Sequence, residues 1–206
     1  LAPNVGAGLR LLARDRAWVL FMAALFVSMV LQAVTFNYSS LYLDGLGASE
    51  GMVGFAGALG SFAQTALLFF VIPELLRRWG SERLMLLAFA MYALRLALWS
   101  AIPEVWAVVA SMAIMGLTFG ASLVAAVDLA DRHAPAGLAT TSQALATGLV
   151  SGLGRAVGGG LAGPLYDGAG PRATFALYAA LALVALVVFA RIWRGGPARG
   201  RGAMVE

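Results

Sequence analysis

Residues 77–104, RRWGSERLMLLAFAMYALRLALWSAIPE, contain the pattern that decides the fold. The central part, Leu84–Ile102, is almost wholly apolar. It has the length of roughly 20 residues that a helix needs to cross a hydrocarbon layer of about 30 Å. Arginines gather at its N-terminal border, whereas its C-terminal border is the acidic turn Pro103–Glu104. Because backbone groups inside lipid must pair with one another, this stretch is predicted to be a transmembrane helix.

The same pattern continues in both directions along the chain. Five further apolar stretches have similar lengths: Trp18–Tyr42, Met52–Leu75, Val105–Leu129, Leu138–Leu161 and Ala173–Trp193. Arginines lie before the first stretch, in every second loop and after the last, while the remaining loops contain only Arg172. Because basic loops stay on the cytoplasmic side, both termini are expected in the cytoplasm. The predicted fold is an all-α integral membrane protein with six transmembrane helices, in a bacterial cytoplasmic membrane.

The composition agrees with this fold class, since 61% of the 206 residues are hydrophobic and only 12% are charged. We expect residues 1–17 to form a cytoplasmic loop or N-terminal segment, residues 18–194 the six-helix transmembrane bundle, and residues 195–206 a cytoplasmic tail. The net charge of +4 sits at the membrane borders, and no basic patch with interleaved aromatic residues occurs. The lipid bilayer, and no nucleic acid, is therefore the expected partner.

Residues that the chain lacks exclude several kinds of chemistry. Without cysteine it forms no disulfide and no cysteine metal site. Its one histidine, His133, lies in a predicted loop, so we expect no metal, haem or other cofactor. Ser151 follows a glycine-containing segment, but a serine nucleophile needs a base within hydrogen-bond reach, and none is predicted near it. We therefore do not expect an enzyme.

Two loops of the chain form a faint internal repeat. Residues 76–83, LRRWGSER, and residues 166–172, YDGAGPR, are both short glycine-containing turns with an arginine shortly after the glycine. Three predicted spans separate them, which places the second turn on the opposite side of the membrane. This arrangement predicts an inverted 3+3 repeat, a common plan among secondary transporters.

Three segments carry a resemblance to the major facilitator superfamily of transporters. They are Pro73–Gly80 followed by Arg83, then Arg95 with Met115–Gly120, and finally Gln143 followed by Gly163–Gly168. The chain resembles the C-terminal six-helix half of this fold, most closely in the lactose-permease-like branch of sugar and nucleoside proton symporters. The resemblance implies one half of a secondary-active transporter. It would move a small solute by alternating access against an N-terminal six-helix half, with spans one, two, four and five around the path.

Two departures from that family leave a different function open. The common loop motif has an acidic residue three positions before its glycine, where this chain has Arg77. The fourth span of such symporters carries a histidine and a glutamate for proton coupling, and residues 105–127 contain neither. The alternative is a half-size protein that does not transport and serves as a structural or assembly subunit beside another membrane subunit.

Several polar residues within the spans are candidates for solute binding or coupling. Arg95 lies where the resembling symporters have a functional arginine, and it either binds an anion or acts structurally. Arg155 either lines a cavity or ties two helices together, and we favour the tie. Asn37, Tyr38 and Gln64 could bind a solute, but polar groups within spans also hold helices together. Gln143, from the resembling segment, is a further candidate.

Other residues are predicted to act in gating and packing. Asp128 and Asp131 lie near a predicted helix C-terminus, where a negative charge is unfavourable, and Arg132 is expected to compensate. We hypothesise a cytoplasmic gate salt bridge among these three residues. The small-residue pairs Gly148/Gly152 and Gly159/Gly163 predict close packing of the fifth span against another helix.

Overall fold

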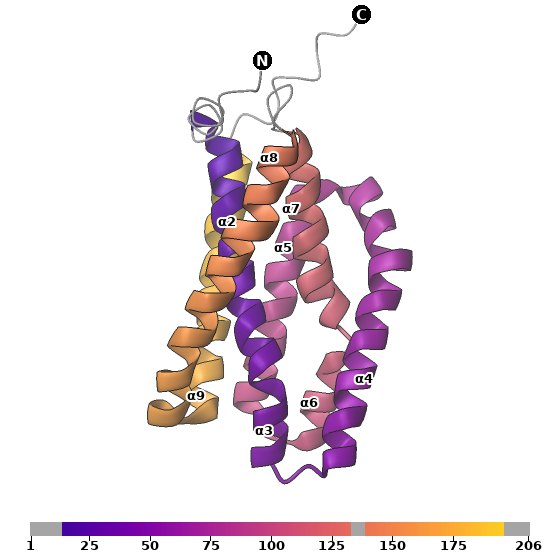
Figure 1. Ribbon diagram of the computed structural model, residues 1–206, viewed down its shortest axis with the longest axis vertical. Helices are drawn as coiled ribbons and strands as arrows, with labels where there is room; N and C mark the ends of the chain where they lie inside the picture. Colours follow the sequence, from indigo (N-terminus) through magenta and orange to yellow (C-terminus); the bar gives the residue numbers. More distant parts are fainter. Residues whose placement is uncertain (1–13, 133–138, 196–206) are drawn as a thin grey trace, which may run out of the picture.

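The computed structural model describes residues 14–132 and 139–195, and all regular structure in this part of the chain is helical (Figure 1). The helices are α2 (Arg16–Asn37), α3 (Ser39–Gly45), α4 (Glu50–Ala66), α5 (Ile72–Ala101), α6 (Val105–Met112), α7 (Ala121–Arg132), α8 (Ala139–Ala144) and α9 (Ser151–Gly195). Three π-helical segments join some of them: η1 (Leu67–Val71), η2 (Gly116–Gly120) and η3 (Leu145–Val150). The predicted all-α class is confirmed.

Two helices begin with side-chain caps that the sequence supplies locally. Asp15 precedes α2 and accepts hydrogen bonds from the backbone nitrogens of Ala17 and Trp18, at 2.8 and 3.3 Å. Ser49 precedes α4 and accepts from the nitrogen of Met52 at 3.3 Å. These bonds satisfy backbone donors that have no partner within the first helical turn, so both helices start at defined residues.

Both α5 and α9 are interrupted by a glycine with positive φ. Gly80 has φ 79° and ψ 167°, and Gly170 has φ 82° and ψ 165°. Glycine reaches this region without the steric cost that other residues incur there. Each glycine therefore divides a long helix into two arms, residues 72–79 and 81–101 in α5, and residues 151–169 and 171–195 in α9. Both predicted loop turns form at these positions.

The second arm of α9 folds back along the first, as Figure 1 shows. Tyr178 in the returning arm donates its hydroxyl hydrogen to the carbonyl oxygen of Gly158 at 3.0 Å. Closer to the reversal, the rings of Tyr166 and Phe175 lie 6.1 Å apart. The two arms are thus antiparallel neighbours.

Three helices in the described ranges are long and apolar enough to cross a membrane: Arg16–Gly45, Glu50–Ala101 and Ser151–Trp193. The helical pair Val105–Met112 and Gly116–Arg132 meets the same criteria when taken together, with a bend of 43°. Two of the three long helices are the ones that Gly80 and Gly170 divide.

One end of the bundle collects the basic residues. Ring contacts of Phe21 with Phe189 and Trp193, at 5.4 and 6.5 Å, bring the start of α2 beside the end of α9. Trp18 donates to Ser142 at 2.9 Å, and Ser142 donates to the carbonyl of Ala130 at 3.1 Å, which adds α8 and the end of α7. We call this the arginine end. The hydrogen bond between Ser81 and Asp128 adds the turn at Gly80. Arginines within or beside these segments are Arg14, Arg16, Arg77, Arg78, Arg83, Arg132 and Arg191.

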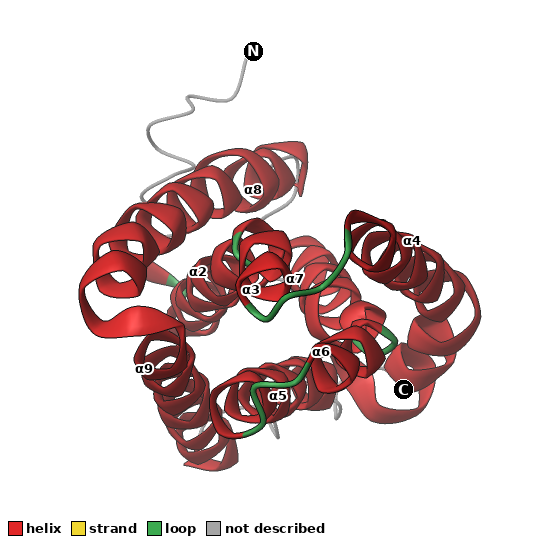
Figure 2. Ribbon diagram, turned by 90° about the horizontal axis from the view of Figure 1, so that it is seen from below, coloured by secondary structure: helices red, strands yellow, loops and turns green. Residues whose placement is uncertain are grey.

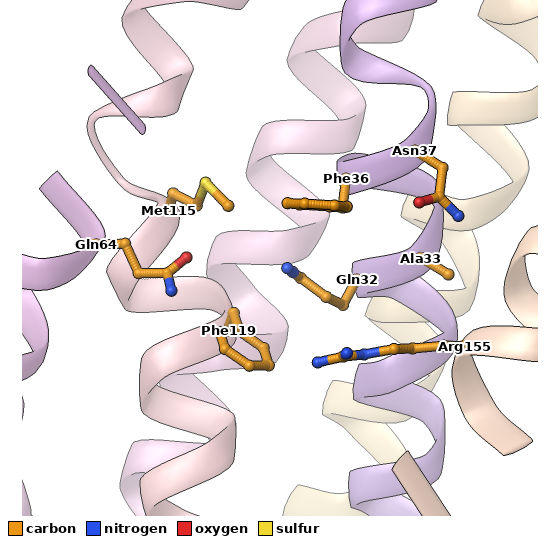
Figure 3. A pocket seen from close by; sticks show the side chains of 8 residues that line it. All are labelled: Gln32, Ala33, Phe36, Asn37, Gln64, Met115, Phe119 and Arg155. Atoms are coloured by element: carbon orange, nitrogen blue, oxygen red, sulfur yellow. The ribbon is translucent and has the colours of Figure 1, made fainter. Parts of the chain in front are cut away.

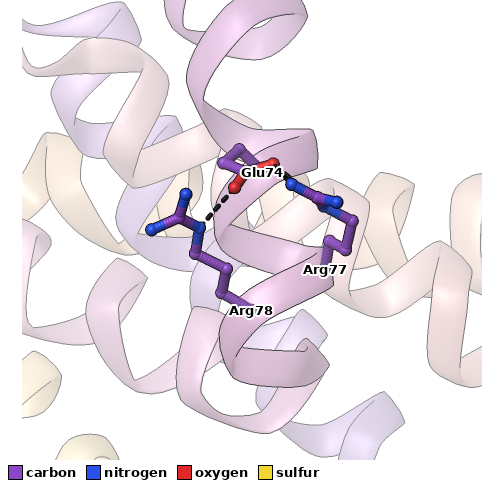
Figure 4. A network of polar contacts seen from close by, with 3 residues as sticks. All are labelled: Glu74, Arg77 and Arg78. Atoms are coloured by element: carbon purple, nitrogen blue, oxygen red, sulfur yellow. Dashed lines mark hydrogen bonds and ion pairs between the residues drawn. The ribbon is translucent and has the colours of Figure 1, made fainter.

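A local network neutralises part of this basic charge (Figure 4). Glu74, in the first turn of α5, accepts from Nε of Arg77 at 2.9 Å and also from Nε of Arg78. Because the arginine side chains are exposed, water and salt screen these pairs, and they orient the side chains more than they stabilise the fold.

The opposite end of the bundle is held by aromatic packing. Phe175 on α9 contacts the rings of Tyr42 on α3 and Trp99 on α5, at centroid distances of 4.7 and 5.1 Å. Tyr42 also donates to the carbonyl oxygen of Trp99 at 2.7 Å. Beside this cluster, Nε of Arg172 donates to the carbonyl of Ser100 at 3.0 Å. We call this the aromatic end.

A very close helix approach joins α9 to α2 through two glycines. A Cβ placed on Gly154 would lie 2.7 Å from the Cβ of Met29, and one on Gly158 would lie 2.5 Å from the carbonyl oxygen of Val30. Neither site has room for a larger residue. Gly154 and Gly158 are four residues apart and therefore share one face of the helix.

The glycines that make this close contact with α2 are not the pairs predicted from the sequence. A Cβ on Gly148 or Gly152 would meet nothing within 4 Å, so that pair makes no close helix contact. A Cβ on Gly159 or Gly163 would lie 3.3 Å from Asn37 and Tyr38 respectively, which is a looser contact with side chains. A helix this rich in glycine offers several small-residue faces, and tertiary packing selects among them.

Candidate functional site

A cavity of about 300 Å³ lies between α2, α4, the α6–η2 region and α9 (Figure 3). Residues from four separate parts of the chain line it: Gln32, Ala33, Phe36, Asn37, Gln64, Met115, Phe119 and Arg155. Figure 2 shows α4 and α9 on opposite sides of the bundle, with α2 and α7 between them. The size of the cavity is at the lower end of the range of about 300–1,000 Å³ that is typical of small-molecule sites.

Helix irregularities lie close to the residues that line the cavity. Gln64 is three residues before η1, whereas Phe119 lies within η2. Arg155 comes five residues after η3. π-Helical segments shift the angular positions of the side chains that follow them, and they are frequent at functional sites. Phe119 and Arg155 thus lie within or after such a segment, whereas Gln64 precedes one.

Three of the predicted candidates meet at this cavity. Asn37 comes from α2, Gln64 from α4 and Arg155 from α9. In Figure 3, the side chains of Gln64 and Arg155 extend toward the cavity from opposite walls. Residues from the predicted first, second, fourth and fifth spans line it, as the resemblance implies for a transport path.

Arg155 is the charged residue among the eight that line the cavity. Its guanidinium lies 5.6 Å from the ring centre of Phe119. Among the described residues, no carboxylate oxygen lies within the 4.0 Å of an ion pair with Arg155. The tie to a second helix that we favoured from the sequence is thus a contact with an aromatic ring, and the positive charge itself faces the cavity.

Gln32 also lines the cavity, although it was not among the predicted candidates. Its side-chain oxygen accepts a hydrogen bond from the hydroxyl of Tyr92 at 2.9 Å. Tyr92 lies on α5 and is fully buried. With its oxygen occupied, Gln32 turns its amide nitrogen to the cavity (Figure 3). The signal that could have found Gln32 is a lone amide within an apolar span.

The remaining lining is apolar, and none of its residues was among the predicted binding candidates. Phe36 is 64% exposed, so a large part of its ring is open at the cavity. Met115 and Phe119 add a flexible thioether and a second ring from the α6–η2 region. Apolar residues within a membrane span carry no sequence signal that separates cavity-lining positions from lipid-facing ones.

Arg95 lies outside the cavity, inside the bundle. It is 1% exposed, its guanidinium stacks over Trp99 at 4.9 Å, and its Nη2 lies 2.9 Å from Sδ of Met112. Its Nε has no hydrogen-bond partner among the residues that the structure describes. Tyr92, three residues earlier, connects this helix to Gln32. Arg95 is therefore a buried charge that does not line the cavity. It lies one helical turn from Tyr92, whose hydroxyl contacts the cavity-lining Gln32.

The other two predicted binding residues lie elsewhere. Tyr38 points at α9, where its hydroxyl donates to the carbonyl of Gly159 at 3.4 Å and its ring lies 5.1 Å from that of Tyr166. Gln143 lies on α8 and donates to Asp131 at 2.9 Å. Neither is among the residues that line the cavity.

The predicted gate residues form contacts at the arginine end. Arg132 pairs with Asp128 at 2.9 Å within α7, and the carboxylate of Asp128 also accepts from the hydroxyl of Ser81 on α5. Asp131 connects α7 to α8 through Gln143. Asp128 thus joins α7 to α5, and Asp131 joins α7 to α8. The ion pair between Asp128 and Arg132 stays within α7. His133 lies outside the described residues.

No metal centre is evident in residues 14–132 and 139–195. In this part of the chain, no three side chains of histidine, cysteine, aspartate or glutamate come together closely enough to hold a metal ion.

Comparison with known proteins identifies the family. Residues 6–177 match the family described as MFS_1 like. The chain belongs to this family, a branch of the major facilitator superfamily (MFS). It is also 22% identical over 151 residues to a protein of Bacillus subtilis (strain 168) named "Uncharacterized transporter YwbF". That alignment covers 73% of this chain and 38% of the relative, so the chain spans well under half of the relative's length.

Membership in the MFS-like family and the long apolar helices together indicate an integral membrane protein. The resemblance noted in the sequence is confirmed at the level of the superfamily. The cavity between four helical elements is the candidate binding site for a small molecule in this chain.

Proposed function

We propose that this chain is one six-span half of a secondary-active transporter, which moves a small solute by alternating access through the cavity at Arg155. The observation that carries the proposal is the origin of the cavity-lining residues. They come from the four predicted spans that would surround the transport path of an MFS half. The path is completed by a second bundle, which we propose to be an N-terminal six-helix half.

The positions of the two glycine reversals support six crossings. Gly80 lies at the arginine end, next to Ser81 and its contact with Asp128. Gly170 lies at the aromatic end, near Arg172. If both divided helices cross the membrane twice, α2–α3 and the bent α6–α7 pair complete six spans. The near-identical backbone angles of the two glycines, three spans apart, favour the inverted 3+3 repeat.

The arginine end is proposed to face the cytoplasm, in accordance with the positive-inside rule. This places both described ends of the chain on the cytoplasmic side of the membrane. In this orientation Asp128, Arg132 and Asp131 form part of a cytoplasmic gate. We further propose, from the resemblance, that the chain corresponds to the C-terminal half of a lactose-permease-like transporter.

Cysteine labelling tests the function, because the chain has no cysteine of its own. The variants Gln64→Cys and Asn37→Cys are made in the natural full-length protein, after any cysteine outside this chain is replaced by serine. Membrane vesicles of both orientations are treated with a membrane-impermeant thiol reagent. We expect labelling of both variants from either side, since alternating access exposes one cavity to each face in turn.

The control is Leu183→Cys, whose side chain is 51% exposed on an apolar face of α9. In the proposed orientation this residue faces lipid and is labelled from neither side. Access to the cavity from one side alone under all conditions would contradict alternating access. That result, together with stable co-purification in a larger membrane complex, would favour the alternative function as an assembly subunit.

A further inference from the structure

Building on the proposed function, we infer that the solute is a small organic anion. Its anionic group binds to the guanidinium of Arg155 and the amide nitrogen of Gln32, and Tyr92 is the positioning residue that orients Gln32 for this contact.

The charge of the cavity is the first step in this inference. Arg155 is always cationic, and no acidic residue is among the eight that line the cavity. Arg155 is an exposed residue at this cavity, and a cleft lined by charge of one sign attracts ions of the opposite sign. An anionic solute neutralises this charge, a neutral solute leaves it uncompensated, and a cationic solute is repelled.

The orientation of Gln32 is the second step. A glutamine amide can present either its oxygen or its nitrogen to a ligand. Here the Tyr92 hydroxyl donates to the oxygen at 2.9 Å, within the buried interface between α2 and α5. The nitrogen is left as the end that faces the cavity. Gln32 is therefore held as a hydrogen-bond donor.

These donors belong to one binding site. Figure 3 shows the side chains of Gln32 and Arg155 extending from adjacent helices into the same part of the cavity. A carboxylate accepts hydrogen bonds on two oxygens, and a guanidinium is well suited to bind it. The pair therefore has the chemistry to hold one anionic group between α2 and α9.

The rest of the wall limits the remainder of the solute. Phe36, Phe119 and Met115 offer apolar surface, and Gln64 on the far wall is the amide that can bind a second polar group. Aromatic rings pack well against flat or aliphatic bodies. The volume of about 300 Å³ admits only a small molecule. The solute is thus an anion with a compact apolar body.

Ligand-induced stabilisation of the purified full-length protein tests this inference. The probes are acetate, hexanoate and benzoate, each beside its uncharged amide, and benzylamine as a cation. A ligand that binds the folded state raises the midpoint of thermal unfolding. We expect at least one carboxylate to raise it well above the shift caused by its amide, and no shift with benzylamine.

Variants of Arg155 and Tyr92 test whether these residues cause the preference for carboxylates over amides. Arg155→Gln abolishes the shift caused by the carboxylates, whereas Arg191→Gln, an exposed arginine of the same helix, leaves it unchanged. Tyr92→Phe weakens carboxylate binding by about 2- to 10-fold, the equivalent of one hydrogen bond. It also narrows the preference for carboxylate over amide, because the freed Gln32 can then present its oxygen. A purely structural role of Tyr92 would leave that ratio unchanged.

Results that contradict the anionic solute can be told apart from results that contradict transport. Equal shifts with carboxylates and amides, or no shift with any probe, overturn the anion assignment. An unchanged carboxylate shift in Arg155→Gln overturns it as well. If two-sided labelling of the cavity cysteines persists in those cases, transport stands and only the solute class is wrong.

Discussion

The hydroxyl of Tyr92 donates to the side-chain oxygen of Gln32 at 2.9 Å and joins the buried centre of α5 to the wall of the cavity. Arg95 lies one helical turn beyond Tyr92 on the same helix, so a buried charge, a buried hydroxyl and a cavity amide follow one another across the bundle. The cavity is therefore organised by a helix that does not itself line it.

Replacing Gly158 by alanine is expected to destabilise the protein. The new Cβ would lie 2.5 Å from the carbonyl oxygen of Val30, so α2 and α9 must separate. Overpacking of this kind costs about 1–3 kcal/mol. The midpoint of thermal unfolding in detergent measures it. The matched control is Gly152→Ala on the same arm, where nothing lies within 4 Å and the helix gains up to about 1 kcal/mol.

Gly170→Ala is expected to destabilise the reversal of α9 through its backbone alone. A Cβ at this position meets nothing within 4 Å, but the φ of 82° is unfavourable for any residue with a side chain. The cost is about 1–2 kcal/mol. Gly168→Ala, two residues earlier and equally free of neighbours, serves as control and should show no loss. Equal unfolding midpoints for both variants would argue against a strained turn at Gly170.

Ser81→Ala removes the hydrogen bond between α5 and α7 at the arginine end. Ser81 is fully buried and its partner Asp128 is charged, so the loss is expected to cost about 1.5–3 kcal/mol of stability. If this contact also helps to close the cytoplasmic gate, Gln64→Cys will react faster from the arginine end in the Ser81→Ala background. Asp128→Asn keeps an acceptor oxygen and should have a smaller effect on both measurements. An unfolding midpoint unchanged in Ser81→Ala would show that the contact contributes little.

Arg95→Gln is expected to abolish transport while the protein still folds. A buried guanidinium with no carboxylate partner among the described residues is costly, so removing its charge should not lower the unfolding midpoint. The measurements are thermal unfolding together with uptake into proteoliposomes. Arg95→Lys keeps the positive charge but replaces the guanidinium that lies over the Trp99 ring, so it tests whether charge alone is sufficient. Normal uptake by Arg95→Gln would make this residue purely structural.

The sequence predicted helices and turns well, because their causes are local. The apolar stretch around Leu84–Ile102 is a helix because a lipid layer leaves backbone groups no other partner. The turns at Gly80 and Gly170 form where positive φ requires glycine. The three π-helical segments were not expected from the sequence, because their positions depend on packing against neighbouring helices.

The site was predicted in part. Asn37, Gln64 and Arg155 stood out as polar residues in apolar spans, and the structure brings them to one cavity. Tyr38 is adjacent to Asn37 in the chain, yet it contacts α9 instead. Neighbours in a helix point about 100° apart, and only the rotation of the helix within the bundle decides which one faces a cavity.

The amino-acid sequence by itself determined that this chain is a set of apolar helices with arginines gathered at one end, since length, hydropathy and turn chemistry act over a few residues. Only the tertiary structure decided that Gly154 and Gly158 make the close contact with α2, and that Tyr92 binds the oxygen of Gln32 and leaves its amide nitrogen facing the cavity. Those choices depend on contacts between residues far apart in the chain, where packing selects one of several faces that are nearly equivalent in sequence.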